Sequence, residues 1–182
     1  MAGLTSRLAG ADDIPALEAV MAAAIGELQR GFLTPAQIAA SRTIMGLDRQ
    51  LIADRSYFVV EAPDAEGARI AGCGGWSRLA TLYGGDHSPG RDAALLVPAV
   101  DAARVRAMYT HPDFARRGVG RLILTLCEAA ARAEGFARLE LMATLAGRPL
   151  YESHGFRALE EVLDDRGGEP VPLVRMGKAI AP

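Results

Sequence analysis

The sequence predicts a single α/β domain in which helices flank a mostly antiparallel sheet that contains one parallel pair of strands. Two apolar-rich hairpins, over residues 56–79 and 156–178, predict the antiparallel part of the sheet. Between them, an amphipathic helix over residues 122–134 connects strands expected at residues 103–108 and 138–143. Because a helical crossover joins parallel neighbours, these two strands form the parallel pair. A length of 182 residues suffices for one domain, residues 1–182, with a sizeable core.

The N-terminal part adds an edge strand and two helices. Residues 6–9 form a short strand, and Asp12 or Asp13 caps a helix that extends to about Arg30. The second helix follows Thr34, where the order Thr-Pro-Ala-Gln matches a capping box with proline at the first helical position. These helices are expected to cover the sheet.

The composition excludes several classes of protein. Half of the residues are hydrophobic and 23% are charged, which argues against disorder. The net charge of −2, with basic residues spread along the chain, argues against a nucleic-acid partner. No apolar run approaches the roughly 20 residues of a membrane span, and the first residues, from Met1, begin no secretory signal. We therefore expect a cytoplasmic protein with no membrane partner. Cys73 and Cys127 fit no metal-ligand spacing, so we expect buried free thiols and no metal.

A glycine-rich turn that opens a helix predicts an anion site. The predicted strand that ends near Met108 is followed by Arg116, Arg117, Gly118, Val119, Gly120 and Arg121. The first backbone N–H groups of a helix lack partners within it, and the helix dipole adds positive charge at that end. Glycines at 118 and 120 remove Cβ atoms that would hold a pyrophosphate away from these amides. The turn lacks the Lys-Ser/Thr pair of a P-loop and the three glycines of a dinucleotide fold.

Two motifs in the C-terminal half resemble one family. Residues 112–120, Pro-Asp-Phe-Ala-Arg-Arg-Gly-Val-Gly, resemble the acyl-CoA pyrophosphate loop of the GNAT superfamily of N-acetyltransferases. Residues 150–156, Leu-Tyr-Glu-Ser-His-Gly-Phe, resemble its second signature, a short helix with a tyrosine followed by Gly-Phe. Both occur in the family's order and spacing. Two positions depart from the pattern: Ala115 replaces a Gln or Arg, and Thr144 replaces the Asn seven positions before the tyrosine.

The resemblance implies a fold, a co-substrate and a reaction. The fold would be a GNAT-like mixed sheet whose central parallel strands splay apart, with the pantetheine of acetyl-CoA in the gap. The reaction would move the acetyl group to a primary amine of a small molecule or peptide by direct attack within a ternary complex, and a homodimer is the family's common assembly. The residues implied in binding the co-substrate are Met108, Tyr109, Thr110, Arg116, Arg117, Gly118, Val119, Gly120, Arg121 and Thr144.

The catalytic residues follow from the same resemblance and from acid–base chemistry. Tyr151 matches the family's tyrosine, and a phenol with a pKa near 10 can protonate a departing thiolate. The alternative for Tyr151 is a core tyrosine paired with Phe156. The general base is open among Asp86, His87 and Glu140.

Two alternatives stay open at this stage. Residues 81–100 form an unusually long segment without periodicity, which indicates either a loop that determines acceptor specificity or a disordered insertion. The second alternative concerns the whole chain, which could be a regulatory module that binds acyl-CoA without catalysis. Turnover of an amine separates that module from the enzyme.

Overall fold

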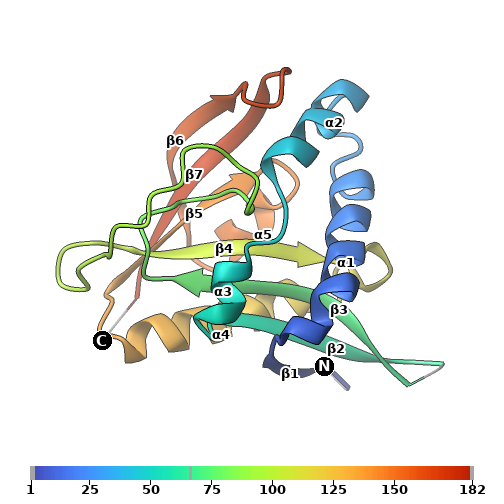
Figure 1. Cartoon of the computed structure of the whole chain (residues 1–182), viewed down its shortest axis with the longest axis horizontal. Helices are drawn as coiled ribbons and strands as arrows, with labels where there is room; N and C mark the ends of the chain where they lie inside the picture. The colour runs from blue at the N-terminus through green and yellow to red at the C-terminus, as the bar shows by residue number, and fades with distance from the viewer. Residues whose placement is uncertain (1–2, 66, 181–182) are drawn as a thin grey trace.

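The computed structural model describes residues 3–65 and 67–180, and it contains one seven-stranded sheet with helices on both faces (Figure 1). Glu66, within the expected hairpin turn, and the chain's first residues lie outside the described part. The strand order is β1-β2-β3-β4-β5-β7-β6, and every neighbouring pair is antiparallel except β4 and β5. This mixed sheet confirms the predicted fold class. The strands are β1 Thr5–Leu8, β2 Tyr57–Asp64, β3 Gly67–Ser77, β4 Ala103–Thr110, β5 Arg138–Thr144, β6 Arg157–Asp164 and β7 Val171–Ala179.

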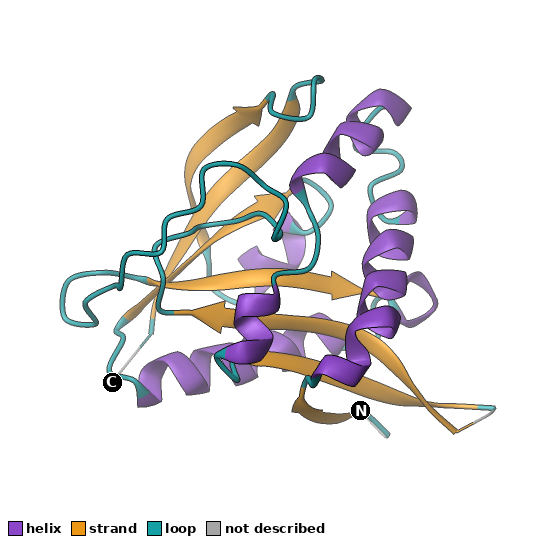
Figure 2. Ribbon diagram, viewed as in Figure 1, coloured by secondary structure: helices purple, strands orange, loops and turns teal. Residues whose placement is uncertain are grey.

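The helices form a layer on each face of the sheet (Figures 1 and 2). Helices α1, α2 and α3 lie on one face together with the loop over residues 81–100, and α4 and α5 lie on the other. Side chains of β2 alternate between the two layers: Val59 packs with Leu17 of α1, and Val60 packs with Ile123 of α4. The helices are α1 Ile14–Glu27, α2 Pro35–Ile44, α3 Arg49–Ala53, α4 Val119–Ala133 and α5 Arg148–Ser153, with 3₁₀ turns at Ala11–Asp13 and Pro112–Phe114.

Side-chain caps begin α2 and α3, whereas Asp13 at the start of α1 makes no cap hydrogen bond, contrary to the prediction. Thr34 and Gln37 form the predicted capping box, in which the Gln37 amide donates to Thr34 Oγ1 at 3.2 Å. Helix α1 ends at Glu27, three residues before the predicted end at Arg30. Helix α3 is not predicted, because five residues are too few to show a helical period. It begins where Asp48 Oδ1 accepts a hydrogen bond from the Gln50 amide.

The long loop over residues 81–100 is packed against the sheet. It contains one isolated β-bridge, between Leu79 and Leu95 at its edge, and no regular strand or helix among the described residues. Side chains hold it instead: Ser88 Oγ donates to the Ile44 carbonyl, and Tyr83 Oη donates to Asp164 at 2.8 Å. These contacts belong to an ordered loop rather than to a disordered insertion.

Glycines in β3 allow close packing on both sides of the strand. A Cβ on Gly72 would lie 2.5 Å from Val119 of α4, and one on Gly75 would lie 2.4 Å from the Ser56 carbonyl oxygen. The register between β3 and β4 also shifts between Cys73 and Gly75. The shift is a bulge, and both glycines allow a close approach that a side chain would block.

We expect Gly75→Ala to destabilise the protein by about 1–3 kcal/mol or more, because the new methyl group would collide with backbone atoms that cannot rotate away. Thermal unfolding followed by circular dichroism measures the effect. The matched control is Gly10→Ala, where the new Cβ would meet its nearest neighbour at 3.8 Å and the change should stay within about 1 kcal/mol. Equal stability of the two variants would contradict this description of β3.

Candidate active site

The central feature of the site is a gap between β4 and β5. The two strands pair only at Ala103 with Leu139 and at Arg104 with Glu140. Beyond these pairs, β4 continues along β3 as far as Thr110, and β5 continues along β7. The backbones of the parallel pair therefore diverge, which confirms the expected splay and leaves the facing edges of both strands without sheet partners.

A bulge in β4 lies at the start of this gap. Gly74 of β3 faces two residues of β4, Ala107 and Met108, because Gly75 pairs with Arg106 and Cys73 pairs with Tyr109. Ala107 has a φ of 49°, an unfavourable value for a residue with a side chain. Tyr57 stabilises the bulge, since its hydroxyl donates to the Ala107 carbonyl at 2.7 Å.

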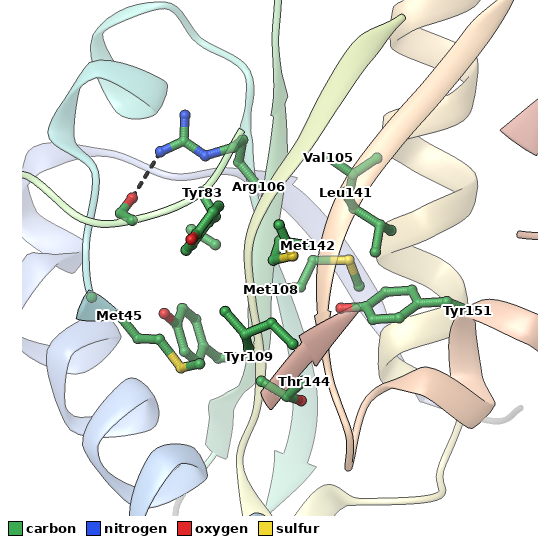
Figure 3. A pocket seen from close by; sticks show the side chains of 14 residues that line it. Met45, Tyr83, Val105, Arg106, Met108, Tyr109, Leu141, Met142, Thr144 and Tyr151 are labelled. Carbon is green, nitrogen blue, oxygen red and sulfur yellow. Dashed lines mark hydrogen bonds between the residues drawn. The ribbon is translucent and has the colours of Figure 1, made fainter. Parts of the chain in front are cut away.

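The gap widens into a cavity of about 90 Å³ (Figure 3). We call this cavity the central pocket. Tyr151 extends from α5 toward Met108 and Met142, so residues distant in sequence meet at one place. Four predicted site residues line the pocket: Met108, Tyr109, Thr144 and Tyr151. The others are Met45, Gly46, Tyr83, Gly84, Val105, Arg106, Ala107, Leu141, Met142 and Leu173.

Tyr151 combines the two roles that the sequence left open. Its ring makes an edge-to-face contact with Phe156 at a centroid distance of 6.1 Å. Burial raises the pKa of its phenol from 10.0 to about 12, and the nearby Cys127 adds to the increase. The hydroxyl has no hydrogen-bond partner within residues 3–65 and 67–180. The side chain is thus packed as a core tyrosine, yet its acidic proton remains available to a bound molecule.

The turn before α4 presents an array of backbone amides. Residue 116 has a φ of 64° and Gly118 a φ of 91°, and these left-handed conformations turn the chain into the helix. In the part of the chain that the structure describes, no backbone N–H from residue 116 to residue 121 donates to a protein acceptor. Arg116, Arg117 and Arg121 are exposed around this array. The geometry fits a pyrophosphate, which needs several convergent donors and positive charge.

The two glycines of the turn have different physical roles. Gly118 is needed for its left-handed backbone. Gly120 is buried, and a Cβ there would lie 2.5 Å from Leu150 Cδ2. Gly120 therefore allows α4 to pack against α5, a reason that differs from the predicted one, access of a ligand to the amides.

The three base candidates lie outside the central pocket. Asp86 accepts hydrogen bonds from Arg49, at 2.8 Å from Nη1 and at 3.0 Å from the backbone amide. Asp86 and His87 line a second hollow of about 330 Å³, which shares Met45 and Gly46 with the central pocket.

Glu140 is the third candidate. It lies where β4 and β5 are still paired, and its Oε2 accepts from Arg104 and Arg175, each at 2.7 Å. Two arginines thus compensate its charge.

Several pocket residues were not predicted. Met45, Gly46, Tyr83 and Gly84 come from segments without periodicity, so no sequence signal connects them with β4. Arg106 carried no separate signal either, because it alternates with Arg104 along the strand, a pattern that does not tell a buried arginine from an exposed one.

Both cysteines are buried free thiols, as predicted. Burial raises the pKa of Cys73 from 9.0 to about 12 and raises that of Cys127 as well. A thiol must be ionised to act as a nucleophile, so neither cysteine is suited to covalent catalysis. Within the described residues no group of three or more His, Cys, Asp or Glu side chains could hold a metal ion, and no helix is long and apolar enough to cross a membrane.

We expect neither cysteine to react with a disulfide reagent at pH 8 in the native protein, because a pKa of about 12 leaves a thiolate fraction on the order of 10⁻⁴. Both should react once guanidinium unfolds the chain. Absorbance of the released chromophore measures this. Rapid labelling of either thiol in the native state would contradict its burial in the core.

Comparisons with known proteins agree with this geometry. A family model described as an acetyltransferase (GNAT) domain matches residues 53–158, more than half of the chain. The chain therefore belongs to the GNAT family, and it is an acyltransferase of the N-acetyltransferase type. The comparison with curated proteins gave no match.

Solved structures share the fold at low sequence identity. A GCN5-related N-acetyltransferase from Rhodopseudomonas palustris is 19% identical, with a TM-score of 0.69 over 99% of this chain and 98% of that one. The PaiA N-acetyltransferase from Thermoplasma acidophilum, in complex with coenzyme A, is 13% identical, with a TM-score of 0.61 over 97% and 99% of the two chains. The ribosomal-protein-S18-alanine N-acetyltransferase from Escherichia coli is 18% identical, with a TM-score of 0.58 over 98% and 95%.

Proposed function

We propose that this protein transfers the acetyl group of acetyl-CoA to a primary amine of a small molecule or peptide, by direct attack within a ternary complex. One observation carries the proposal: the strand that lines the central pocket leads directly into the turn with unpaired amides. A long donor with a pyrophosphate at one end and a thioester at the other matches these two features. The coenzyme A complex of the Thermoplasma acidophilum structure supports the same choice of donor.

The donor would be held mainly by backbone groups. The amides of residues 116–121 would bind the pyrophosphate, and the exposed arginines beside them would add positive charge. The unpaired edge of β4 at Met108, Tyr109 and Thr110 would bind the pantetheine, and Thr144 lies across the gap. Because backbone amides would bind the pyrophosphate, Ala115 in place of Gln or Arg leaves the site intact.

Tyr151 would serve as the general acid. With a pKa of about 12 its hydroxyl keeps its proton at neutral pH. When the amine nitrogen bonds to the carbonyl carbon and the carbon–sulfur bond breaks, the phenol proton passes to the sulfur, and the proton that the nitrogen loses in becoming an amide restores the phenol. The amine must arrive without its extra proton. Asp86 and His87 are the base candidates that the second hollow joins to the pocket, and Glu140 is the candidate on β5.

We further propose that residues 1–182 act as one acyltransferase domain. The acceptor amine would approach from the face of the sheet that carries α1, α2, α3 and the loop over residues 81–100, because α4 and the donor occupy the other face. That loop contributes Tyr83 and Gly84 to the pocket, as expected of a specificity element. A homodimer remains the expected assembly.

A negative charge at the turn before α4 should weaken donor binding. We expect Gly118→Asp to weaken acetyl-CoA binding on the order of 10²-fold, because a carboxylate beside the pyrophosphate repels it. Gly118→Asn is the matched control, because asparagine and aspartate tolerate a left-handed backbone about equally and differ mainly in charge. Isothermal titration calorimetry measures both. Equal affinities for the two variants would show that the donor does not bind there.

Loss of the phenol should slow chemistry without affecting donor binding. We expect Tyr151→Phe to lower kcat by about 10²-fold or more for any accepted amine, since general acid catalysis contributes about 10²–10⁴-fold. The dissociation constant for acetyl-CoA should change little, because the ring and its contact with Phe156 remain. Release of free thiol across an amine panel gives the rates. Tight acetyl-CoA binding with no turnover by the wild type would instead support the regulatory module.

A further inference from the structure

A buried ion cluster lies beside the central pocket. Asp48, at the start of α3, binds two arginines: its Oδ2 accepts from Arg106 Nη2 at 2.8 Å, and its Oδ1 accepts from Arg91 Nη2 at 3.0 Å. The side chains of Asp48 and Arg106 are 1% and 2% exposed. We call these three residues the Asp48 cluster.

The cluster binds the loop through backbone oxygens. Arg106 Nη1 donates to the Thr81 carbonyl at 3.0 Å, and Nη2 donates to the Gly84 carbonyl at 2.7 Å (Figure 3). Arg91 Nη1 donates to the Gly85 carbonyl at 3.1 Å. A planar guanidinium can reach several acceptors at fixed angles, which a lysine ammonium does less well.

Two irregular segments are thereby attached to the sheet. Residues 44–47 and 84–86 bind each other, since the Gly85 amide donates to the Ile44 carbonyl and the Asp86 amide donates to the Leu47 carbonyl. Neither segment belongs to a strand of the sheet, yet they supply Met45, Gly46 and Gly84 to the pocket. Arg106 connects this two-segment unit to β4, one residue before the bulge at Ala107.

The hydrogen bonding of Arg106 indicates that this side chain fixes the geometry of its neighbours rather than adding to the stability of the fold. Its Nε is a buried side-chain atom without a partner, and no other side-chain nitrogen or oxygen in the described residues shares that state. Burial also lowers the pKa of the Arg106 guanidinium, which Asp48 partly offsets. A well-packed apolar pair is often at least as stable as a buried ion pair of similar volume. The arrangement is therefore better suited to fixing geometry than to maximising stability.

We propose that Arg106 is a positioning residue that fixes the wall of the central pocket facing the acceptor amine. This inference rests on the proposed function. The donor would be bound by the backbone of β4 from Met108 to Thr110 and by the turn before α4. The Arg106 side chain instead donates to Asp48 and to the carbonyls of Thr81 and Gly84. Arg106 therefore sets the affinity for the amine through Met45, Gly46, Tyr83 and Gly84, and acts little on acetyl-CoA.

The test uses a double variant, Asp48→Asn with Arg106→Met, which removes both charges together. Removing one partner alone would leave an unpaired buried charge and endanger folding. The introduced asparagine retains a side-chain oxygen to cap α3. We expect the KM for the amine to rise about 10-fold or more, the acetyl-CoA dissociation constant to stay within about 2-fold, and amide exchange over residues 81–92 to accelerate.

Arg7→Met is the control, because Arg7 of β1 also binds two carboxylates, Asp13 and Glu61, and none of these three residues lines the central pocket or the second hollow. It should leave the amine KM unchanged. If the double variant fails to fold, Arg106→Lys replaces it and should raise the amine KM in the same direction by a smaller factor. The proposal would be overturned if the amine KM of the double variant did not change. It would also be overturned if the amine KM and the acetyl-CoA dissociation constant rose by equal factors, or if amide exchange over residues 81–92 did not change. If the wild type binds acetyl-CoA but acetylates no amine, that result contradicts the proposed function, and the proposed role of Arg106 is rejected with it.

Discussion

The short parallel pairing between β4 and β5 is the constraint on which the site depends. Two residue pairs hold the strands together, and beyond Arg104 and Glu140 each strand follows a different neighbour. A parallel pair at the centre of a sheet normally satisfies its backbone groups along its whole length. Here the facing edges stay open, and the bulge at Ala107 lies just beyond the last β4–β5 pair. The pocket, the approach of Tyr151 and the proposed place of the donor all follow from this divergence.

Packing on the α4 face fixes the position of the turn before α4 relative to the gap between β4 and β5. Small residues in β3 let Val119 and Ile123 approach the sheet, and Gly120 lets α5 approach α4. The start of α4 is consequently held against the sheet just after β4 ends, with its first amides unpaired. On the opposite face the walls are irregular segments held by charged side chains, chiefly Arg106 and Asp48. Under the proposed function, the α4 face would hold acetyl-CoA and the opposite face would hold the acceptor amine.

The sequence predicts the features that depend on short-range patterns. The Thr34 capping box, the hairpins and the crossover helix α4 each leave a signal within a few residues. The donor-binding role of the turn before α4 is predicted from its glycines and from the family resemblance, although Gly120 has a packing role that neither reveals. The pocket wall could not be predicted, because the segments of Met45 and Tyr83 are attached to β4 by Arg106, whose partners Asp48 and Gly84 are distant from it in sequence. Helix α3 was too short to show a period, and the roles of Asp86, His87 and Glu140 remain predictions.

We infer that the open edge of β4 and the turn before α4 form one donor site. Hydrogen exchange with and without acetyl-CoA tests this inference. Unpaired amides exchange rapidly unless a ligand binds them. We expect acetyl-CoA to slow exchange at residues 116–121 and along β4 after Arg104, while exchange in the β6–β7 hairpin stays unchanged. Protection confined to other segments, or none at saturating acetyl-CoA, would contradict it.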